Sequence, residues 1–286
     1  MINKLNYYHV DVFSSRPLSG NGLTVVFHEE ELEAQFMLKL AQEFKQFETI
    51  FLRQTAEKCF RARIFTVEEE LDFAGHPVLG AASTIHEKFY PQEAAVTVPF
   101  TLNRKIVETV SGKMQDYYQA TMNQGIPKYL GTVNKEPRNV ILRALNLDES
   151  NLFNPLPMEV ISTGLSYLII PLASGLAQAK ILINDLKAQL NKVNAKFVYI
   201  VDIAKMEGRT WDNLGAVEDV ATGSAAGPVG AYLYKHKICD PAEPILLNQG
   251  RFVGRPSKIT VCAHQTSGEI YVAGDVKIIV KGEIYE

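Results

Sequence analysis

FAGHPVLGAASTI (residues 73–85) and DVATGSAAGPVGAYL (residues 219–233) are the two stretches of this sequence that decide the expected fold. Each follows strand-like sequence, has a glycine-containing loop, and continues as a run of Gly, Ala, Ser and Pro with few large side chains. Residues this small allow a helix to pack closely against a sheet or to be surrounded by one. We interpret the two stretches as equivalent helices of a degenerate internal duplication, one in each half of the chain.

The tripeptide Gly75-His76-Pro77 predicts the point at which a loop becomes the first of these helices. Gly75 permits backbone angles that other residues avoid, and Pro77 suits a helix start, where its missing N–H is no loss. Related halves would bring both helix N-termini to one cleft about a pseudo-two-fold axis. Because each N-terminus offers unpaired N–H groups and the positive end of a helix dipole, the pair would bind a small carboxylate.

Composition limits the classes of partner that this chain of 286 residues can have. The formal net charge is −3 and the charges of both signs are mixed, so we expect no nucleic-acid partner. No apolar run approaches the ~20 residues that span a bilayer, so we expect no membrane partner. The three cysteines, Cys59, Cys239 and Cys262, lie far apart, which favours a reduced, cytoplasmic location over a disulfide framework.

Gly, Pro and polar residues interrupt the pattern at GIPKYLGTVNKEP (125–137), where we predict a domain boundary. The predicted domains are 1–124 and 125–286, with the last strand a candidate to return to the first domain. Apolar residues at helical spacing predict helices over 31–47 and 175–193. Strand-like segments separate them in both halves.

Three acid or base residues each allow a chemical and a structural interpretation. His76 is a general acid/base in the cleft or a loop histidine without further role. Asp219 holds a proton, or it caps the helix and bonds its own loop. Glu48 is partly desolvated by its apolar neighbours, as suits a proton carrier, or it is an ordinary exposed residue at a helix end.

Two residues of the second stretch have a similar ambiguity. Gly223 and Ser224 either donate N–H and hydroxyl groups to a carboxylate or form a tight turn. Other chemistries have weaker support, since GNGLTV (20–25) lacks the third glycine of a dinucleotide fingerprint and no P-loop occurs. The cysteines and histidines lack paired metal spacing, and no G-x-S-x-G elbow surrounds Ser224. We therefore predict no metal and no cofactor.

Six segments resemble the PhzF-like family, which is named for an isomerase of phenazine biosynthesis. They occur in family order over nearly the whole chain: DVFSSRPLSGNGLTVV (11–26), FETIFL (47–52), RIFTVEEELDFAGHPVLGAA (63–82), STGLSYLIIPL (162–172), EDVATGSAAGPVGAYL (218–233) and NQGRFVGRPS (248–257). The resemblance implies the diaminopimelate epimerase-like fold, an α+β architecture of two pseudo-symmetric domains. Each domain has a curled, mostly antiparallel sheet around a central helix, and the active site lies between them. It also implies a homodimer that needs no cofactor.

The resemblance also implies roles for individual residues. The epimerases of this fold use a cysteine near each central helix, which this sequence lacks at both places. The family's isomerase uses a glutamate to shuttle a proton during an allylic rearrangement, and that glutamate corresponds to Glu48. The implied supporting acid/base residues are His76 and Asp219, and the implied substrate-binding residues are Asn21, Gly75, Gly223 and Ser224.

We therefore expect a cofactor-independent isomerase that moves a proton on a small, amino acid-like carboxylate in small-molecule biosynthesis. Two alternatives remain open, a non-catalytic protein that binds a small acid and a lyase or hydrolase on the same scaffold. A Glu48 side chain that points to bulk solvent, away from His76, would favour the binding protein. Unchanged substrate mass would distinguish an isomerase from a lyase or hydrolase.

Overall fold

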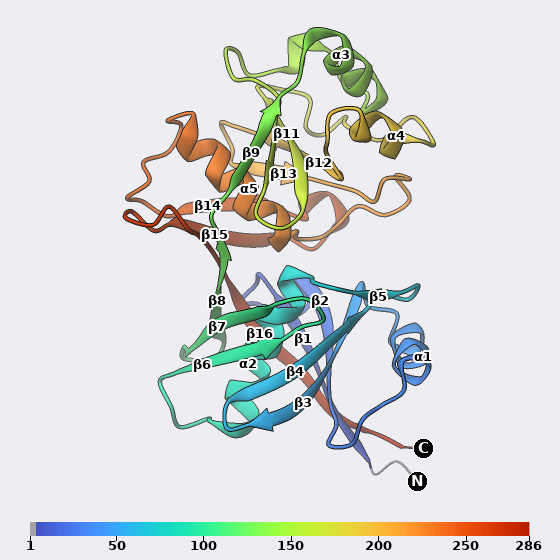
Figure 1. Cartoon of the computed structure of the whole chain (residues 1–286), viewed down its shortest axis with the longest axis vertical. Helices are drawn as coiled ribbons and strands as arrows, with labels where there is room; N and C mark the ends of the chain where they lie inside the picture. Colours follow the sequence, from blue (N-terminus) through green and yellow to red (C-terminus); the bar gives the residue numbers. More distant parts are fainter. Residues whose placement is uncertain (1–3, 286) are drawn as a thin grey trace. The chain divides into compact units, whose positions relative to one another are not determined.

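The computed structural model describes residues 4–285, which form two compact units (Figure 1). Unit 1 contains the described residues up to Asn123 together with those from Ala273 onward, and unit 2 contains Gln124–Val272. Both units combine helices with a mostly antiparallel sheet. The prediction of an α+β fold is confirmed.

The sheet of unit 1 surrounds helix α2 (Gly75–Phe89), and helix α1 (Ala34–Phe44) contacts β3 and β4. Its strand order is β1-β2-β3-β4-β6-β7-β8-β16, and β16 also pairs with β1, so the sheet closes on itself. The β2–β3 and β4–β6 pairs of this unit are parallel. The strands are β1 (Leu5–Val12), β2 (Asn21–Phe27), β3 (Glu48–Ala56), β4 (Cys59–Phe65), β5 (Glu70–Leu71), β6 (Ala95–Thr101), β7 (Ile106–Lys113), β8 (Tyr118–Gly125) and β16 (Ile270–Ile284).

Helix α2 is buried from Gly75 to His86 because its residues are small enough for strands to approach on several sides. It contacts β1, β2, β3, β6 and β7. Gly80 marks the closest approach, since a Cβ atom there would lie 2.4 Å from a methyl group of Leu23. The predicted close packing of this small-residue helix is confirmed.

Unit 2 repeats this arrangement around helix α5 (Gly223–Lys235), which contacts β10, β11 and β15 (Figure 1). The strand order is β15-β14-β13-β12-β11-β10-β9. A Cβ atom on Gly230 would lie 2.4 Å from Val261 Cγ1 on β15, so the helix again needs a glycine at its contact with the sheet. The other elements are β9 (Lys128–Thr132), α3 (Lys135–Ala144), η1 (Glu149–Asn151), β10 (Glu159–Ser162), β11 (Ser166–Leu172), α4 (Leu186–Asn191), β12 (Phe197–Asp202), β13 (Glu207–Arg209), β14 (Ile245–Gln249), η2 (Arg251–Val253) and β15 (Ser257–Ala263).

Two predicted helices are shorter in the structure than in the sequence analysis. The helix predicted over 31–47 occupies Ala34–Phe44 and ends at Lys45, whose backbone is left-handed. The prediction over 175–193 was wrong for its first half, because only Leu186–Asn191 is helical. The carbonyl groups of Leu176 and Ala179 accept hydrogen bonds from Arg209 instead of from a following helical turn. This tertiary contact overrides the local helical pattern.

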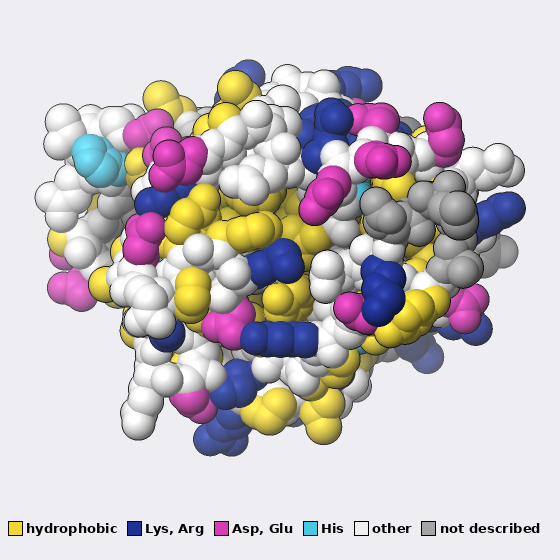
Figure 2. All heavy atoms as spheres, turned by 90° about the horizontal axis from the view of Figure 1, so that it is seen from below, with side chains coloured by type: hydrophobic (Ala, Val, Ile, Leu, Met, Phe, Trp, Pro, Cys, Tyr) yellow, Lys and Arg dark blue, Asp and Glu magenta, His cyan; other side chains and the backbone are white. Residues whose placement is uncertain are grey.

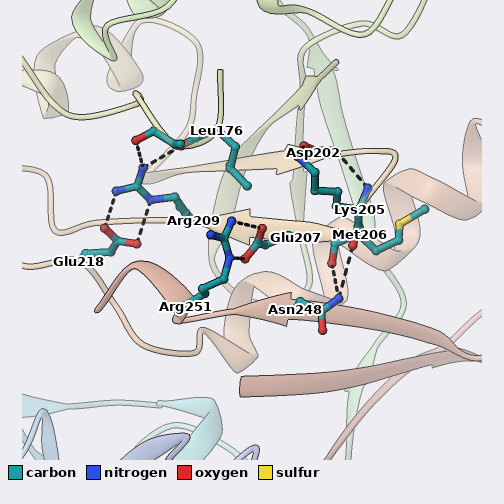
Figure 3. A network of polar contacts seen from close by, with 10 residues as sticks. Leu176, Asp202, Lys205, Met206, Glu207, Arg209, Glu218, Asn248 and Arg251 are labelled. Atoms are coloured by element: carbon teal, nitrogen blue, oxygen red, sulfur yellow. Dashed lines mark hydrogen bonds and ion pairs between the residues drawn. The ribbon is translucent and has the colours of Figure 1, made fainter. Parts of the chain in front are cut away.

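Arg209 of unit 2 makes several polar contacts, and Figure 3 shows its guanidinium beside Glu218 and Leu176. Its guanidinium donates two hydrogen bonds to the Glu218 carboxylate, at 2.6 and 2.9 Å, and others to the carbonyls of Leu176 and Ala179 at 2.7 and 3.0 Å. The rings of Trp211 and Phe252 also contact this guanidinium, with centroids 4.8 and 4.3 Å away. Since Glu218 precedes Asp219, these contacts anchor the entry to the glycine-containing loop before α5.

Charged side chains of both signs are interspersed on the face shown in Figure 2, and hydrophobic side chains gather between them. This mixing agrees with the near-neutral composition of the sequence. Among the helices of residues 4–285, none is both long enough and apolar enough to cross a membrane.

Glu218→Gln should destabilise the protein by about 3–5 kcal/mol, because it leaves the buried Arg209 guanidinium without a charged partner. The measurement is the free energy of unfolding in urea. Glu207→Gln is the matched control, since its partner Arg251 is 59% exposed and stays solvated, so its effect should be within about 1 kcal/mol. Equal losses in the two variants would contradict this account of Arg209.

Gly230→Ala should destabilise the protein by about 1–3 kcal/mol, although the same change in an exposed helix is stabilising by about 1 kcal/mol. The reason is the overlap between the new methyl group and Val261 Cγ1. Urea unfolding measures the effect, and the additional change Val261→Ala should recover part of it by making room. If Gly230→Ala alone is as stable as the wild type, the contact between α5 and Val261 has room for a methyl group, which contradicts this account.

Candidate functional site

Three predicted site residues come together in unit 1 and form what we call the acid/base cluster: Asn21, Glu48 and His76. Asn21 begins β2, Glu48 begins the neighbouring parallel strand β3, and His76 is the second residue of α2. Parallel pairing of β2 with β3 places Glu48 opposite Leu23, two residues beyond Asn21. Gly20, with a φ of +73°, forms the tight turn before β2, where a Cβ atom would lie 2.4 Å from the carbonyl oxygen of Val12.

The His76 imidazole is held between the other two members of the cluster. Its Nε2 atom lies 3.3 Å from Glu48 Oε2, and its Nδ1 atom lies 3.4 Å from the amide nitrogen of Asn21. Burial lowers the pKa of His76 to about 3, so the ring is neutral at neutral pH. Because the Asn21 amide nitrogen donates, Nδ1 is the acceptor and Nε2 carries the proton. The Nε2–H group is therefore on the side of the Glu48 carboxylate.

Glu48 is not the exposed helix-end residue that the sequence left as an alternative. Its side chain is 17% exposed, and it lies at the start of a strand beside His76. The distance of 3.3 Å between the two side chains is within ion-pair range, although the pair is not aligned as a hydrogen bond. Catalytic contacts are often loose before substrate binds. The carboxylate thus keeps limited access to solvent and a neutral donor beside it.

The first turn of α2 provides backbone donors next to this cluster. Ala74 precedes the helix in an extended conformation and supplies no side-chain cap. The N–H groups of Gly75 and His76 belong to the first turn, where helical geometry provides no acceptor. Pro77 has no N–H at the third helical position, so it adds no further unpaired donor. This end of α2 can therefore accept an anionic group.

The other three predicted residues lie together in unit 2, at the start of α5. We call residues 219–222 the Asp219 loop. The Asp219 N–H donates to the carbonyl of Thr210 at 3.0 Å, while its carboxylate accepts from the hydroxyl of Thr222 at 2.5 Å and from the N–H of Ala221 at 3.4 Å. Asp219 thus makes the loop hydrogen bonds that the sequence analysis considered, and these bonds fix the direction of its carboxylate.

Gly223 and Ser224 are the first two residues of α5. The Ser224 hydroxyl and the phenolic hydroxyl of Tyr167 on β11 are 2.8 Å apart and share a hydrogen bond. The carbonyl of Gly223 accepts a hydrogen bond from the Gln124 amide at 2.8 Å. The Thr222 side chain does not cap the helix, and the N–H groups of Gly223 and Ser224 occupy its first two positions, where helical geometry provides no acceptor.

Sequence reasoning assigned no role to Tyr167 or Gln249 and considered Thr222 as a side-chain cap of the helix, a bond that it does not make. All three residues contact predicted site residues. Thr222 bonds Asp219, Tyr167 bonds Ser224, and the Gln249 amide donates to the carbonyl of Asp219 at 2.9 Å. Two of these residues lie far from the loop in sequence, so only a tertiary contact reveals them. The dipeptide Gln249-Gly250, a glutamine directly before a glycine, was the one local signal in the sequence.

A separate cavity of about 600 Å³ in unit 1 contains none of the predicted site residues. Its walls combine phenylalanines, among them Phe27, Phe60 and Phe89, with a run of glutamates at 29–31 and 33. Its histidine, His28, is bonded through Nδ1 to the carbonyl of Glu30 at 2.7 Å. Concave shape alone would favour this cavity as a ligand site. The paired carboxylate and imidazole of the acid/base cluster are the stronger indication of proton-transfer chemistry.

The chain is similar to known proteins over nearly its whole length. The family model described as "Phenazine biosynthesis-like protein", PhzC-PhzF, matches residues 10–282. Trans-2,3-dihydro-3-hydroxyanthranilate isomerase of Pseudomonas aeruginosa is 31% identical over 295 residues, which cover 98% of this chain and 99% of that protein. A solved structure described as a predicted epimerase, PA4716 of Pseudomonas aeruginosa, is 42% identical with a TM-score of 0.91, covering 98% of this chain and 99% of its own.

The same architecture occurs in more distant proteins. A hydroxyproline epimerase from Agrobacterium vitis superposes with a TM-score of 0.65 at 12% identity, over 98% of this chain and 91% of that one. At that identity the likeness concerns the fold, and it confirms the predicted diaminopimelate epimerase-like architecture. The family match and the isomerase names of the relatives lead to one conclusion: the chain belongs to the PhzC-PhzF family of phenazine biosynthesis-like proteins and is an enzyme of the isomerase type.

Proposed function

We propose that this protein is a cofactor-independent isomerase that moves a proton between two carbon atoms of a small carboxylate-bearing substrate. The observation that carries the proposal is the Glu48 carboxylate, mostly buried and 3.3 Å from a neutral imidazole. A carboxylate in such surroundings is suited to accept a proton from carbon and to return it.

In the proposed reaction, Glu48 removes a proton from one carbon while the electron pair of the C–H bond forms a new C=C bond. The adjacent double bond shifts, and its far carbon takes the proton back from the protonated Glu48. Atoms and electrons balance without an oxidant or a second substrate. Substrate and product therefore have the same mass, as an isomerase requires.

His76 supports this cycle as a neutral hydrogen-bond donor. Its Nε2–H group lies on the side of Glu48 and can stabilise the carboxylate each time it forms. Asn21 fixes the tautomer from the other side of the ring and is itself fully buried. We propose that the predicted substrate-binding role of Asn21 is exerted through His76.

The start of α2 and the start of α5 each offer groups suited to bind a carboxylate. Gly75 belongs to the first, and Gly223 and Ser224 belong to the second. Helix N-termini attract anions because their N–H groups are unpaired and the helix dipole is positive there. We propose that Asp219 supports the same reaction as a second acid/base group with a fixed orientation.

The name of one relative supports a proposal for the substrate class. The Pseudomonas aeruginosa relative is named for trans-2,3-dihydro-3-hydroxyanthranilate, a cyclic amino acid with a carboxylate beside a diene. A cyclic, unsaturated amino acid would supply both a carboxylate for a helix N-terminus and an allylic proton for Glu48. We propose this class for the present protein. The homodimer, the cytoplasmic location and the biosynthetic role stay predictions.

Glu48→Gln should lower isomerase turnover by a factor of about 10²–10⁴, because it removes the group that carries the proton. The measurement incubates wild type and variant with a panel of cyclic amino acids, including trans-2,3-dihydro-3-hydroxyanthranilate, in heavy water. NMR then follows the position and deuterium content of each C–H bond. Glu43→Gln on the exposed surface of α1 is the matched control and should leave turnover unchanged.

Three results would contradict the proposal. Equal conversion by wild type and Glu48→Gln would remove Glu48 from the reaction. A product of altered mass would indicate a lyase or hydrolase. Saturable binding of panel members without conversion of any of them would indicate a small-acid-binding protein.

His76 should stay neutral from pH 7.5 down to pH 5, since its pKa in the folded protein is about 3. The ordinary value of 6.5 applies after unfolding, so the unfolded chain binds more protons between these two values. Falling pH therefore destabilises the wild type, by at most about 1.4 kcal/mol per pH unit from this group. His76→Gln should lack this contribution.

The ring resonances of His76 in NMR spectra test this directly, and exposed His264 provides the comparison within the same sample. Urea unfolding of wild type and His76→Gln at pH 7.5, 6 and 5 tests the linkage. A His76 ring that titrates near pH 6.5 would show that the imidazole is charged and cannot act as the neutral donor described.

A further inference from the structure

Gln249, at the end of β14, has every hydrogen-bonding position of its amide occupied. Its nitrogen donates to the carbonyl of Asp219 and to the hydroxyl of Thr222, both at 2.9 Å. Its oxygen accepts from the Thr222 N–H at 3.2 Å and from the Tyr199 hydroxyl at 3.1 Å. Two donors and two lone pairs are all that an amide offers. The side chain is 1% exposed, so its role is internal.

These contacts fix the orientation of the amide. Exchange of its oxygen and nitrogen would place oxygen against the carbonyl of Asp219 and an NH₂ group against the Thr222 N–H. Tyr199 adds to the constraint, because burial raises the pKa of its phenol and keeps the hydroxyl protonated as a donor. The Tyr199 ring is held in turn by Gly208, where a Cβ atom would lie 2.2 Å from a ring carbon.

The contacts also form a directed chain that ends on the Asp219 carboxylate. Thr222 Oγ1 accepts from Gln249 and therefore presents its own hydrogen to Asp219 Oδ2, 2.5 Å away. Gln249 thus holds both ends of the Asp219 loop, the carbonyl of its first residue and the N–H and hydroxyl of its last. Gly223, the first residue of α5, follows directly.

Gly250 brings the same strand end against the loop backbone. Its φ is +83°, and a Cβ atom there would lie 2.6 Å from the carbonyl oxygen of Val220 and 2.3 Å from that of Arg255. Only a glycine allows this approach. The dipeptide Gln249-Gly250 therefore braces the loop through one side chain and one backbone segment.

We infer that Gln249 is a positioning residue, which orients the Asp219 carboxylate and the first turn of α5 for the reaction. The inference rests on the proposed function for the role of Asp219. Gln249 itself acts through Asp219 and Thr222 and need not touch the substrate. Displacement of a reacting group by about 1 Å can lower a rate about 100-fold. Loss of the hydrogen bonds from Gln249 to the Asp219 loop should therefore lower turnover measurably.

Gln249→Glu tests the inference, since it keeps the size of the side chain but replaces the donating nitrogen with oxygen. Turnover of the substrate identified in the panel above should fall about 10- to 100-fold. In an Asp219→Asn background, the same change should cause little additional loss, because Gln249 acts through Asp219. Gln265→Glu, an exposed substitution with the same change of charge, should have no effect.

Tyr199→Phe is a second, milder variant that removes one donor to Gln249 and should reduce turnover several-fold without unfolding the chain. A readout independent of activity is the set of backbone amide NMR signals of residues 219–224. These signals should shift in Gln249→Glu and stay unchanged in Gln265→Glu. Fluorescence of Trp211, the single tryptophan, verifies that the surrounding unit remains folded in each variant.

Unchanged loop signals in Gln249→Glu would overturn the inference, as would fully additive losses in the double variant. A different result identifies failure of the proposed function. If Asp219→Asn and Glu48→Gln both leave turnover of an identified substrate intact while the loop signals shift in Gln249→Glu, the brace exists but the proposed catalytic roles are wrong.

Discussion

Contact between a glycine on a buried helix and a branched side chain on the surrounding sheet is the constraint on which this structure depends. Gly80 lies against Leu23 in unit 1, and Gly230 lies against Val261 in unit 2. A larger residue at either place would push the helix away from its strands. Both helices are almost entirely buried, so their starting positions are set by packing rather than by solvent-exposed caps.

The two helix starts have different chemical surroundings. The start of α2 adjoins a carboxylate and a neutral imidazole, Glu48 and His76, in a largely desolvated setting. The start of α5 adjoins a carboxylate, Asp219, whose direction is determined by hydrogen bonds from its own loop. One set is thus suited to proton transfer and the other to fixed orientation. Two similarly built units thus have two distinct local chemistries.

The sequence predicted the class of fold and the positions of both buried helices because small residues leave a clear pattern. It also pointed to Glu48, His76 and Asp219 through the resemblance of their motifs. It could not distinguish an exposed Glu48 from a buried one, because burial depends on strand pairing between β2 and β3. The helix prediction for residues 175–185 failed because of another tertiary contact. The Arg209 guanidinium donates hydrogen bonds to the carbonyls of Leu176 and Ala179 in that segment.

The amino-acid sequence by itself determined which two segments would be buried helices, and it indicated where acid/base residues stand beside their starts. These properties follow from side-chain size and local backbone preference, which act over a few residues. Only the tertiary structure decided that His76 is neutral with its proton on the side of Glu48, and that Gln249 holds the Asp219 loop at both ends. Desolvation and hydrogen bonds between residues distant in the sequence produce these properties, and neither exists until the chain has folded.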